Sequence, residues 1–128
     1  MAIPWKDLYK VGHEVIDAEH QELFSKANVF LSATDKASLT AGAMELYKYT
    51  REHFGHEESL MREITYPATE AHIQQHNDLI RRLNEIAVNI AGNQLDHKEL
   101  EDFLSDWLLV HIRVYDTKLA AHLVNAAR

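Results

Sequence analysis

The chain has 128 residues, about the size of one ordinary domain and enough to bury a core without disulfides. It carries 20 acidic and 13 basic residues, and the net charge of −7 disfavours nucleic acid and anionic membrane surfaces as partners. The absence of cysteine excludes disulfide scaffolds, thiolate metal sites, iron–sulfur clusters and thiol nucleophiles, so any metal must be held by nitrogen and oxygen.

Residues 1–16 contain Trp5, Tyr9 and Val11 without a regular spacing, so we expect an irregular N-terminal arm packed along the rest of the domain. The first residues lack the charged start and apolar run of a signal peptide, and no later stretch reaches the roughly 18 apolar residues of a membrane span. We therefore expect a cytoplasmic protein without membrane insertion.

Apolar residues recur at three- and four-residue steps in four segments, which is the pattern of amphipathic helices. The spacing predicts helices from about 17 to 33, 39 to 63 and 69 to 90. A fourth helix opens after Asp96, which with Glu99 resembles a capping box, and continues to His111. The breaks between them are short: the polar residues 32–38, Thr65-Tyr66-Pro67, and Gly92-Asn93.

Four helices with short connections predict an all-α fold, an antiparallel up-down four-helix bundle. We expect a single domain over residues 1–128, with the arm at 1–16 and the bundle at 17–116. The remaining residues, 117–128, form a C-terminal tail that could add a short helical turn.

Pairs of candidate ligands lie on the second and third predicted helices. His53 and Glu57 are four residues apart, which places both side chains on one helix face, and His72 and His76 repeat that spacing. A single buried histidine is more often a hydrogen-bonded core residue than a ligand. Two pairs on successive helices instead favour a metal site.

The other two helices also carry histidine on their apolar faces, His20 on the first and His111 on the fourth. Five buried imidazoles without ligation would leave polar nitrogens unpaired at about 1–3 kcal/mol each. Asp116 lies five residues past His111, which in a regular α-helix puts it on another face. Either the helix ends near Val114, or a π-type bulge brings Asp116 under His111.

These motifs resemble those of the hemerythrin family, specifically the single-domain bacterial hemerythrins, and the resemblance spans residues from about 5 to 116. The motifs are Ile16-Asp17-Ala18-Glu19-His20, His53-Phe54-Gly55-His56-Glu57-Glu58, His72-Ile73-Gln74-Gln75-His76 and the segment from Trp107 to Asp116.

The resemblance implies two iron ions, Fe(II) or Fe(III), joined by an oxo or hydroxo bridge. It assigns three histidines to one iron, two to the other and two carboxylates to both: His72, His76 and His111; His20 and His53; Glu57 and Asp116. The two-histidine iron then has an open coordination place for dioxygen. An apolar pocket around it would comprise Leu108, Trp107, Phe54, Met61 and Ile112, although core packing explains these residues equally well.

Four histidines have no counterpart in the family motifs and are interpreted as surface residues or as neighbours of the ligands: His13, His56, His97 and His122. Glu58 is interpreted as a solvated or structural residue, with a hydrogen bond to another ligand as one option.

The expected function is reversible binding of dioxygen for transport, storage or delivery, by a monomer that is not an enzyme and that supplies an oxygen-consuming enzyme. Two alternatives stay open: oxygen or redox sensing through a partner protein, and di-iron peroxidase or nitric oxide chemistry. A pair of zinc or manganese ions also fits the ligand types, because imidazole suits several metals.

Overall fold

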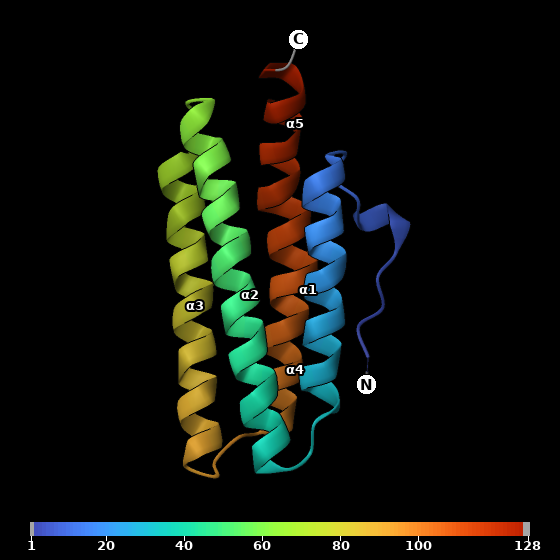
Figure 1. The fold of residues 1–128 in the computed structure, drawn as a ribbon, viewed down its shortest axis with the longest axis vertical. Coiled ribbons are helices and arrows are strands. Elements are labelled where there is room, and N and C mark those ends of the chain that lie inside the picture. Colours follow the sequence, from blue (N-terminus) through green and yellow to red (C-terminus); the bar gives the residue numbers. More distant parts are fainter. Residues whose placement is uncertain (1, 127–128) are drawn as a thin grey trace.

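The computed structural model describes residues 2–126 and consists of helices joined by short turns. Three long helices, α1 (Glu14–Ser32), α2 (Lys36–Glu63) and α3 (Thr69–Ala91), run alternately up and down. A fourth segment returns beside them through α4 (His97–Asp106), the π-helix η2 (Trp107–Asp116) and α5 (Thr117–Ala126). Figure 1 shows these segments side by side, which confirms the predicted antiparallel four-helix bundle. No helix in the described part of the chain is long and apolar enough to cross a membrane.

The helix α1 begins at Glu14, three residues before the predicted start at Asp17. His13 caps it, because its ring Nδ1 accepts a hydrogen bond of 3.3 Å from the backbone N–H of Ile16. Asp17 is a buried residue that accepts a 2.7 Å bond from the backbone N–H of Val11. Its carboxylate thus ties the arm to the helix, and the arm ends at residue 13 instead of 16.

The arm contains a short 3-10 helix, η1 (Asp7–Tyr9), and lies along α1 as expected. The side chain of Asn28 exchanges two hydrogen bonds with the backbone of Ile3, at 2.7 and 2.8 Å. The ring of Phe24 contacts those of Trp5 and Tyr9, at centroid distances of 5.2 and 5.6 Å. These contacts fix the arm to the middle of α1.

The helix α2 also begins earlier than predicted, at Lys36. Asp35 caps it by accepting hydrogen bonds of 2.8 and 2.9 Å from the backbone and hydroxyl of Ser38. Residues 64–68 form the predicted turn into α3, which ends at Ala91 with Gly92 as its C-cap. Asp96 caps α4 by accepting a 2.9 Å bond from the backbone N–H of Lys98.

The C-terminal tail is longer and more regular than the short helical turn expected. The fourth segment continues past Asp116 into α5 without a break, and both Leu119 and Ala120 are fully buried. Residue 116 is therefore not a boundary of the bundle. Residues 127 and 128 of the predicted tail lie outside the described residues.

The buried apolar side chains form two clusters. The large one fills the half of the bundle around Phe30, Leu46 and Leu100, whereas the small one consists of Met61, Tyr66 and Leu119. Along α2, the buried polar residues His53 and Glu57 come between Leu46 and Met61. A polar layer thus crosses the bundle between the two clusters.

Candidate metal centre

The structure brings all seven predicted ligands together in this polar layer. They come from α1, α2, α3 and η2, and each is at most 2% exposed. Their ligand atoms form two groups, in each of which the atoms lie within 4.8 Å of one another. One group is His20, His53, Glu57 and Asp116, and the other is Glu57, His72, His76, His111 and Asp116.

Both carboxylates belong to both groups, and Glu57 divides its two oxygens between them. Oε1 of Glu57 lies 3.0 Å from Nε2 of His76 and 3.3 Å from Nε2 of His72. Its other oxygen, Oε2, lies 3.3 Å from Nε2 of His53 and 3.8 Å from Nε2 of His20. One side chain therefore faces the three-histidine group with one oxygen and the two-histidine group with the other.

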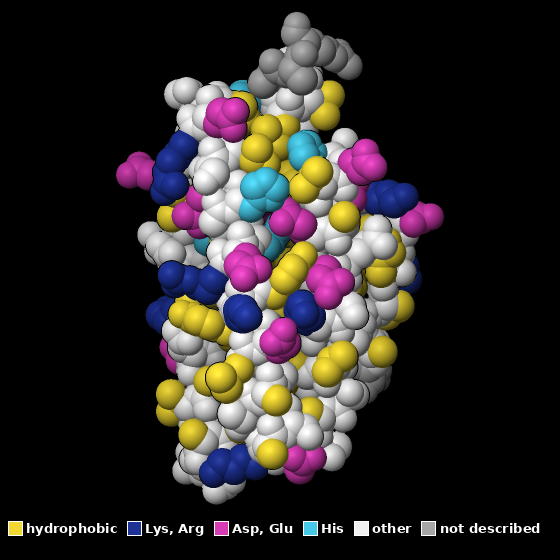
Figure 2. All heavy atoms as spheres, in the orientation of Figure 1, with side chains coloured by type: hydrophobic (Ala, Val, Ile, Leu, Met, Phe, Trp, Pro, Cys, Tyr) yellow, Lys and Arg dark blue, Asp and Glu magenta, His cyan; other side chains and the backbone are white. Residues whose placement is uncertain are grey.

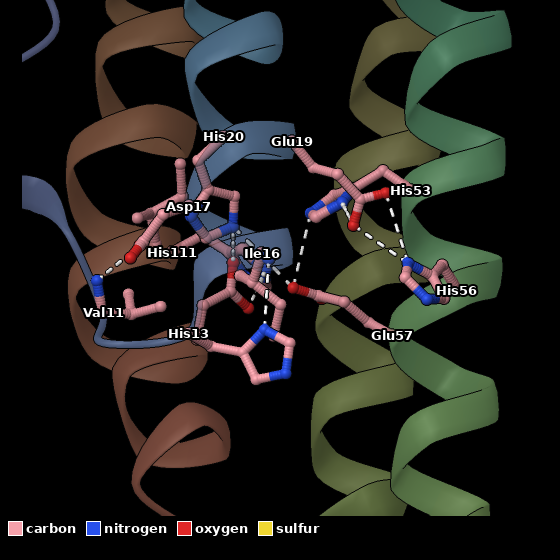
Figure 3. Close-up of polar contacts among 12 residues, drawn as sticks. Val11, His13, Ile16, Asp17, Glu19, His20, His53, His56, Glu57 and His111 are labelled. Atoms are coloured by element: carbon pink, nitrogen blue, oxygen red, sulfur yellow. Dashed lines mark hydrogen bonds and ion pairs between the residues drawn. The ribbon is translucent and has the colours of Figure 1, made fainter. Parts of the chain in front are cut away.

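Asp116 repeats this division from the opposite side of the layer. Its Oδ1 lies 3.0 Å from Nε2 of His72 and 3.3 Å from Nε2 of His111, whereas Oδ2 lies 2.9 Å from Nε2 of His20. Figure 3 shows the convergence of side chains from separate helices on this region. Each of the two carboxylates therefore offers one oxygen to each histidine group.

The π-helix η2 explains how Asp116 reaches the layer. Its hydrogen bonds run from residue i to i+5, so that residues five apart share a face, as His111 and Asp116 do. The bulge predicted as one alternative is confirmed, and the other alternative, a helix end near Val114, is wrong. A regular α-helix would have turned this carboxylate away from the layer.

Most of the converging atoms have close neighbours but no hydrogen-bond partner in the described structure. This holds for Nε2 of His20, His53, His72 and His111, for Oε2 of Glu57 and for both oxygens of Asp116. Unsatisfied buried polar atoms cost about 1–3 kcal/mol each. Shared metal ions would satisfy all of them, and imidazole with carboxylate suits iron, zinc and manganese. The residues present therefore fit a pair of such ions.

Two further carboxylates contact the outer nitrogens of ligand rings. Nδ1 of His76 donates a 2.9 Å hydrogen bond to Glu58, the option anticipated for that residue. Glu19 lies 3.3 Å from Nδ1 of His53, at the distance of an ion pair, and was not predicted to take part. Its position beside His20 in the sequence was the available signal, but only the packing of α1 on α2 reveals its target.

A family model described as "Hemerythrin HHE cation binding domain" matches residues 11–123. The chain belongs to the hemerythrin family. Bacteriohemerythrin from Stenotrophomonas maltophilia is 33% identical over 97% of this chain and 86% of that protein. Bacteriohemerythrin from Pseudomonas aeruginosa is 34% identical over 97% of this chain and 80% of that protein. Myohemerythrin from Sipunculus nudus is 29% identical over 93% of this chain and 92% of that protein.

A crystal structure of a hemerythrin point mutant has the same fold. It superposes with a TM-score of 0.85 over 96% of this chain and 98% of the other, at 20% identity. The resemblance inferred from the sequence motifs is thus confirmed by the family match, and the bundle by this structural likeness.

Charges in the centre of this hemerythrin are strongly coupled. Burial lowers the pKa of His53, but the carboxylates of Glu19 and Glu57 outweigh it and raise the pKa to about 10. At His72 burial is likewise outweighed by Asp116 and Glu57, and the pKa rises to about 9. Burial raises the pKa of Glu57, yet its histidine neighbours hold it well below the usual range. In the metal-free protein, protons on imidazole therefore compensate the buried carboxylates.

Metal uptake by this hemerythrin is expected to strengthen with rising pH. Because His53 and His72 keep their protons up to pKa values of about 10 and 9, an incoming metal ion must displace them at neutral pH. Each displaced proton changes the apparent affinity by about tenfold per pH unit. Calorimetric titration of metal-free protein with Zn²⁺ in buffers of different ionisation enthalpy should show proton release. Affinity that is constant between pH 6.5 and 8 would contradict this coupling.

The five residues of the expected apolar pocket do not form one wall. Trp107, Leu108, Phe54 and Ile112 belong to the large cluster, whereas Met61 belongs to the small one, on the other side of the polar layer. The ring of Phe54 lies flat against that of His76, with centroids 3.7 Å apart and an interplanar angle of 4°. A surface groove of about 730 Å³ between α2 and α3 is lined by none of these five residues or the seven ligands.

The four histidines outside the ligand set have other contacts. His13 caps α1, the ring Nε2 of His97 donates a 2.9 Å hydrogen bond to the backbone oxygen of Leu31, and His122 lies edge-on to Tyr66. His56 contacts Glu19 at 3.0 Å. It is thus the one of the four that reaches a neighbour of a ligand.

Proposed function

We propose that this hemerythrin binds dioxygen reversibly at a non-haem di-iron centre. In this proposal one iron is held by three histidines, the other by two, and both by two carboxylates: His72, His76 and His111; His20 and His53; Glu57 and Asp116. The observation that carries it is the division of each carboxylate's oxygens between the two histidine groups. Family membership supports the same metal pair.

When bound, an iron pair would supply the electrons for reversible binding of dioxygen. The protein's part is to hold five neutral imidazoles and two carboxylates in fixed positions within a layer that excludes water. Only two of the seven ligands are anionic, and fewer anionic ligands stabilise higher-valent iron less. The ligand set therefore favours binding of oxygen over its cleavage.

Reconstitution tests the proposal directly. Metal-free protein is loaded with Fe(II) under argon, iron is counted per chain, and the visible spectrum is followed through cycles of air and argon. Two irons per chain and an absorption band that appears and disappears with oxygen are expected. Fewer than two irons, or oxidation at the first exposure to air, would overturn it. Rapid multiple turnover with peroxide would support the enzymatic alternative instead.

Replacing Leu108 with alanine should leave both irons bound yet speed autoxidation several-fold. Leu108 is 1% exposed and lies in η2, the element that also carries His111 and Asp116, so we expect its truncation to open space for water near the centre. The change should also cost about 2–5 kcal/mol of unfolding free energy, as other buried Leu→Ala changes do. The rate is measured from the decay of the oxygenated band.

Leu100→Ala is the matched control, because Leu100 is equally buried in the same cluster but lies in α4, away from η2. It should lose similar stability without faster autoxidation. Equal rates of autoxidation in the two variants would mean that Leu108 serves packing alone.

Several expectations from the sequence stay predictions. They are that the protein is a monomer, that it is cytoplasmic, that it is not an enzyme, and that it supplies oxygen to an oxygen-consuming enzyme.

A further inference from the structure

Two carboxylates outside the ligand set contact the metal-binding histidines from behind. Glu58 on α2 accepts the 2.9 Å hydrogen bond from Nδ1 of His76, and Glu19 on α1 lies 3.3 Å from Nδ1 of His53. In both rings the other nitrogen, Nε2, faces Glu57, at 3.0 and 3.3 Å. Each ring thus lies between an inner and an outer carboxylate.

This arrangement decides which nitrogen of each ring carries the proton. A neutral imidazole has one N–H donor and one lone pair, and only the nitrogen with the lone pair can bind a metal. With an acceptor behind Nδ1, the proton stays on that nitrogen and Nε2 faces the centre with its lone pair. The negative charge of the outer carboxylate also makes the ring a stronger electron donor.

The outer carboxylates are divided between the two histidine groups. His76 belongs to the three-histidine group and His53 to the two-histidine group, so each group has one ring with a carboxylate behind it. Nδ1 of His20, His53 and His111 all lack a hydrogen-bond partner in the described structure, but of these three only Nδ1 of His53 has a carboxylate outside the ligand set at ion-pair distance, that of Glu19. An outer carboxylate is therefore a feature of particular rings, not a general property of the ligands.

Each outer carboxylate also has a basic neighbour on its solvent side. His56, whose side chain is 43% exposed, contacts both oxygens of Glu19 at 3.0 and 3.3 Å. Arg62 approaches Glu58 at 4.0 Å. Figure 3 shows Glu19 between His53 and His56, and Figure 2 shows histidine and acidic side chains side by side on the face formed by α1 and α2. Glu19 thus contacts a histidine on each side, whereas Glu58 has an exposed arginine at the limit of ion-pair distance.

We propose that Glu19 and Glu58 are positioning residues, one for each iron: Glu19 sets the tautomer and orientation of His53, and Glu58 those of His76. This inference rests on the proposed function, because it takes Nε2 of both rings as metal ligands. It adds to the seven-ligand set two residues that never touch the metal but control how firmly each half of the centre holds its ion.

The test replaces each carboxylate with alanine and with glutamine. Glu19→Ala and Glu58→Ala should each weaken the binding of one of two metal ions by about 10- to 100-fold, the usual cost of losing such an outer contact. The glutamine variants should recover much of the affinity, since the amide oxygen still accepts from Nδ1–H. Glu52→Gln, at an exposed position of α2, is the matched control and should change nothing.

A spectroscopic readout separates positioning from general destabilisation. In protein filled with Zn²⁺ and labelled with ¹⁵N at histidine, His53 and His76 should both show the tautomer with the proton on Nδ1. Among the ligand histidines, Glu19→Ala should change the signals of His53 alone and Glu58→Ala those of His76 alone; His56, which also contacts Glu19, should respond to Glu19→Ala as well. Unchanged tautomers and unchanged metal affinity in both alanine variants would overturn the proposal.

The zinc experiment does not depend on oxygen chemistry. A protein that shows the predicted signals with Zn²⁺ but fails to bind oxygen reversibly with iron would contradict the proposed function while leaving the positioning role intact. Oxygen binding that survives in full, with both alanine variants indistinguishable from the parent in the zinc spectra, would contradict the positioning role alone.

Discussion

Glu57→Gln is expected to leave the protein unable to hold two metal ions. Glu57 approaches four of the five ligand histidines and contributes an oxygen to both groups, so its loss affects both irons at once. Glutamine keeps the shape of the side chain but removes the charge and replaces one oxygen with an NH₂ group, which cannot bind a metal ion. Metal affinity should fall at least about 100-fold, because even contacts outside the ligand set contribute 10- to 100-fold.

The measurement is the number of metal ions per chain after loading and desalting, with Zn²⁺ and with Fe(II). Glu63→Gln is the control, since Glu63 is an exposed residue of the same helix. It should retain two ions. If Glu57→Gln also retained two ions with unchanged affinity, Glu57 would be a hydrogen-bonding residue of the core and the bridging assignment would fail.

The spacing of the ligands along the helices was predictable because helical geometry is fixed. His53 with Glu57, and His72 with His76, lie four residues apart and therefore share a face in any α-helix. Their convergence also followed from pattern, since each predicted helix carries its histidine on the apolar face that must point inward. The structure places all of these side chains in one buried layer.

The position of Asp116 could not be predicted from spacing, because it depends on a change of helix type. Both a helix end near Val114 and a π-type turn agreed with the sequence. What favours the π-helix is the gain from placing a buried carboxylate beside three imidazoles, His20, His72 and His111. That gain is tertiary and has no signature in local propensity.

Two features were missed because they depend on contacts between distant or unusual partners. The helix α1 begins at Glu14, earlier than predicted, and its N-cap is the imidazole of His13. The sequence rules favour Ser, Thr, Asp or Asn at an N-cap, so His13 was not recognised in that role. Glu19 was given no role of its own beside His20, because residues one apart point in different directions on a helix. Only the packing of α1 against α2 brings Glu19 to His53.

Removal of both metal ions should destabilise the bundle strongly and unevenly. Ions that bind only the folded state stabilise it by about 4 kcal/mol per site when free metal exceeds the dissociation constant a thousandfold. Without them the polar layer retains its unsatisfied atoms. Thermal unfolding with and without a chelator should therefore differ by many degrees. Equal midpoints would contradict a metal centre that contributes to folding.

The loss should be concentrated at one end of the bundle. Beyond the polar layer the described core is the small cluster of Met61, Tyr66 and Leu119 with a few partly buried neighbours, whereas the large cluster packs the other end of the bundle. Hydrogen exchange in the metal-free protein should therefore accelerate most around Met61 and Leu119, and least around Leu46. Uniform acceleration would indicate instead that the two ends unfold as one unit.

The stability of the metal-free protein should also depend on pH, because two histidines of the polar layer have raised pKa values. His53 and His72 have folded-state pKa values of about 10 and 9, above the ordinary 6.5. Protons bound in this way stabilise the fold fully below pH 6.5, and that contribution is lost as the pH rises through 9 to 10. Metal-free protein should therefore become less stable between pH 7 and 10. The metal-loaded protein should keep its stability over this range, because its metal ions replace those protons. A parallel loss of stability in both forms would contradict this account of the centre.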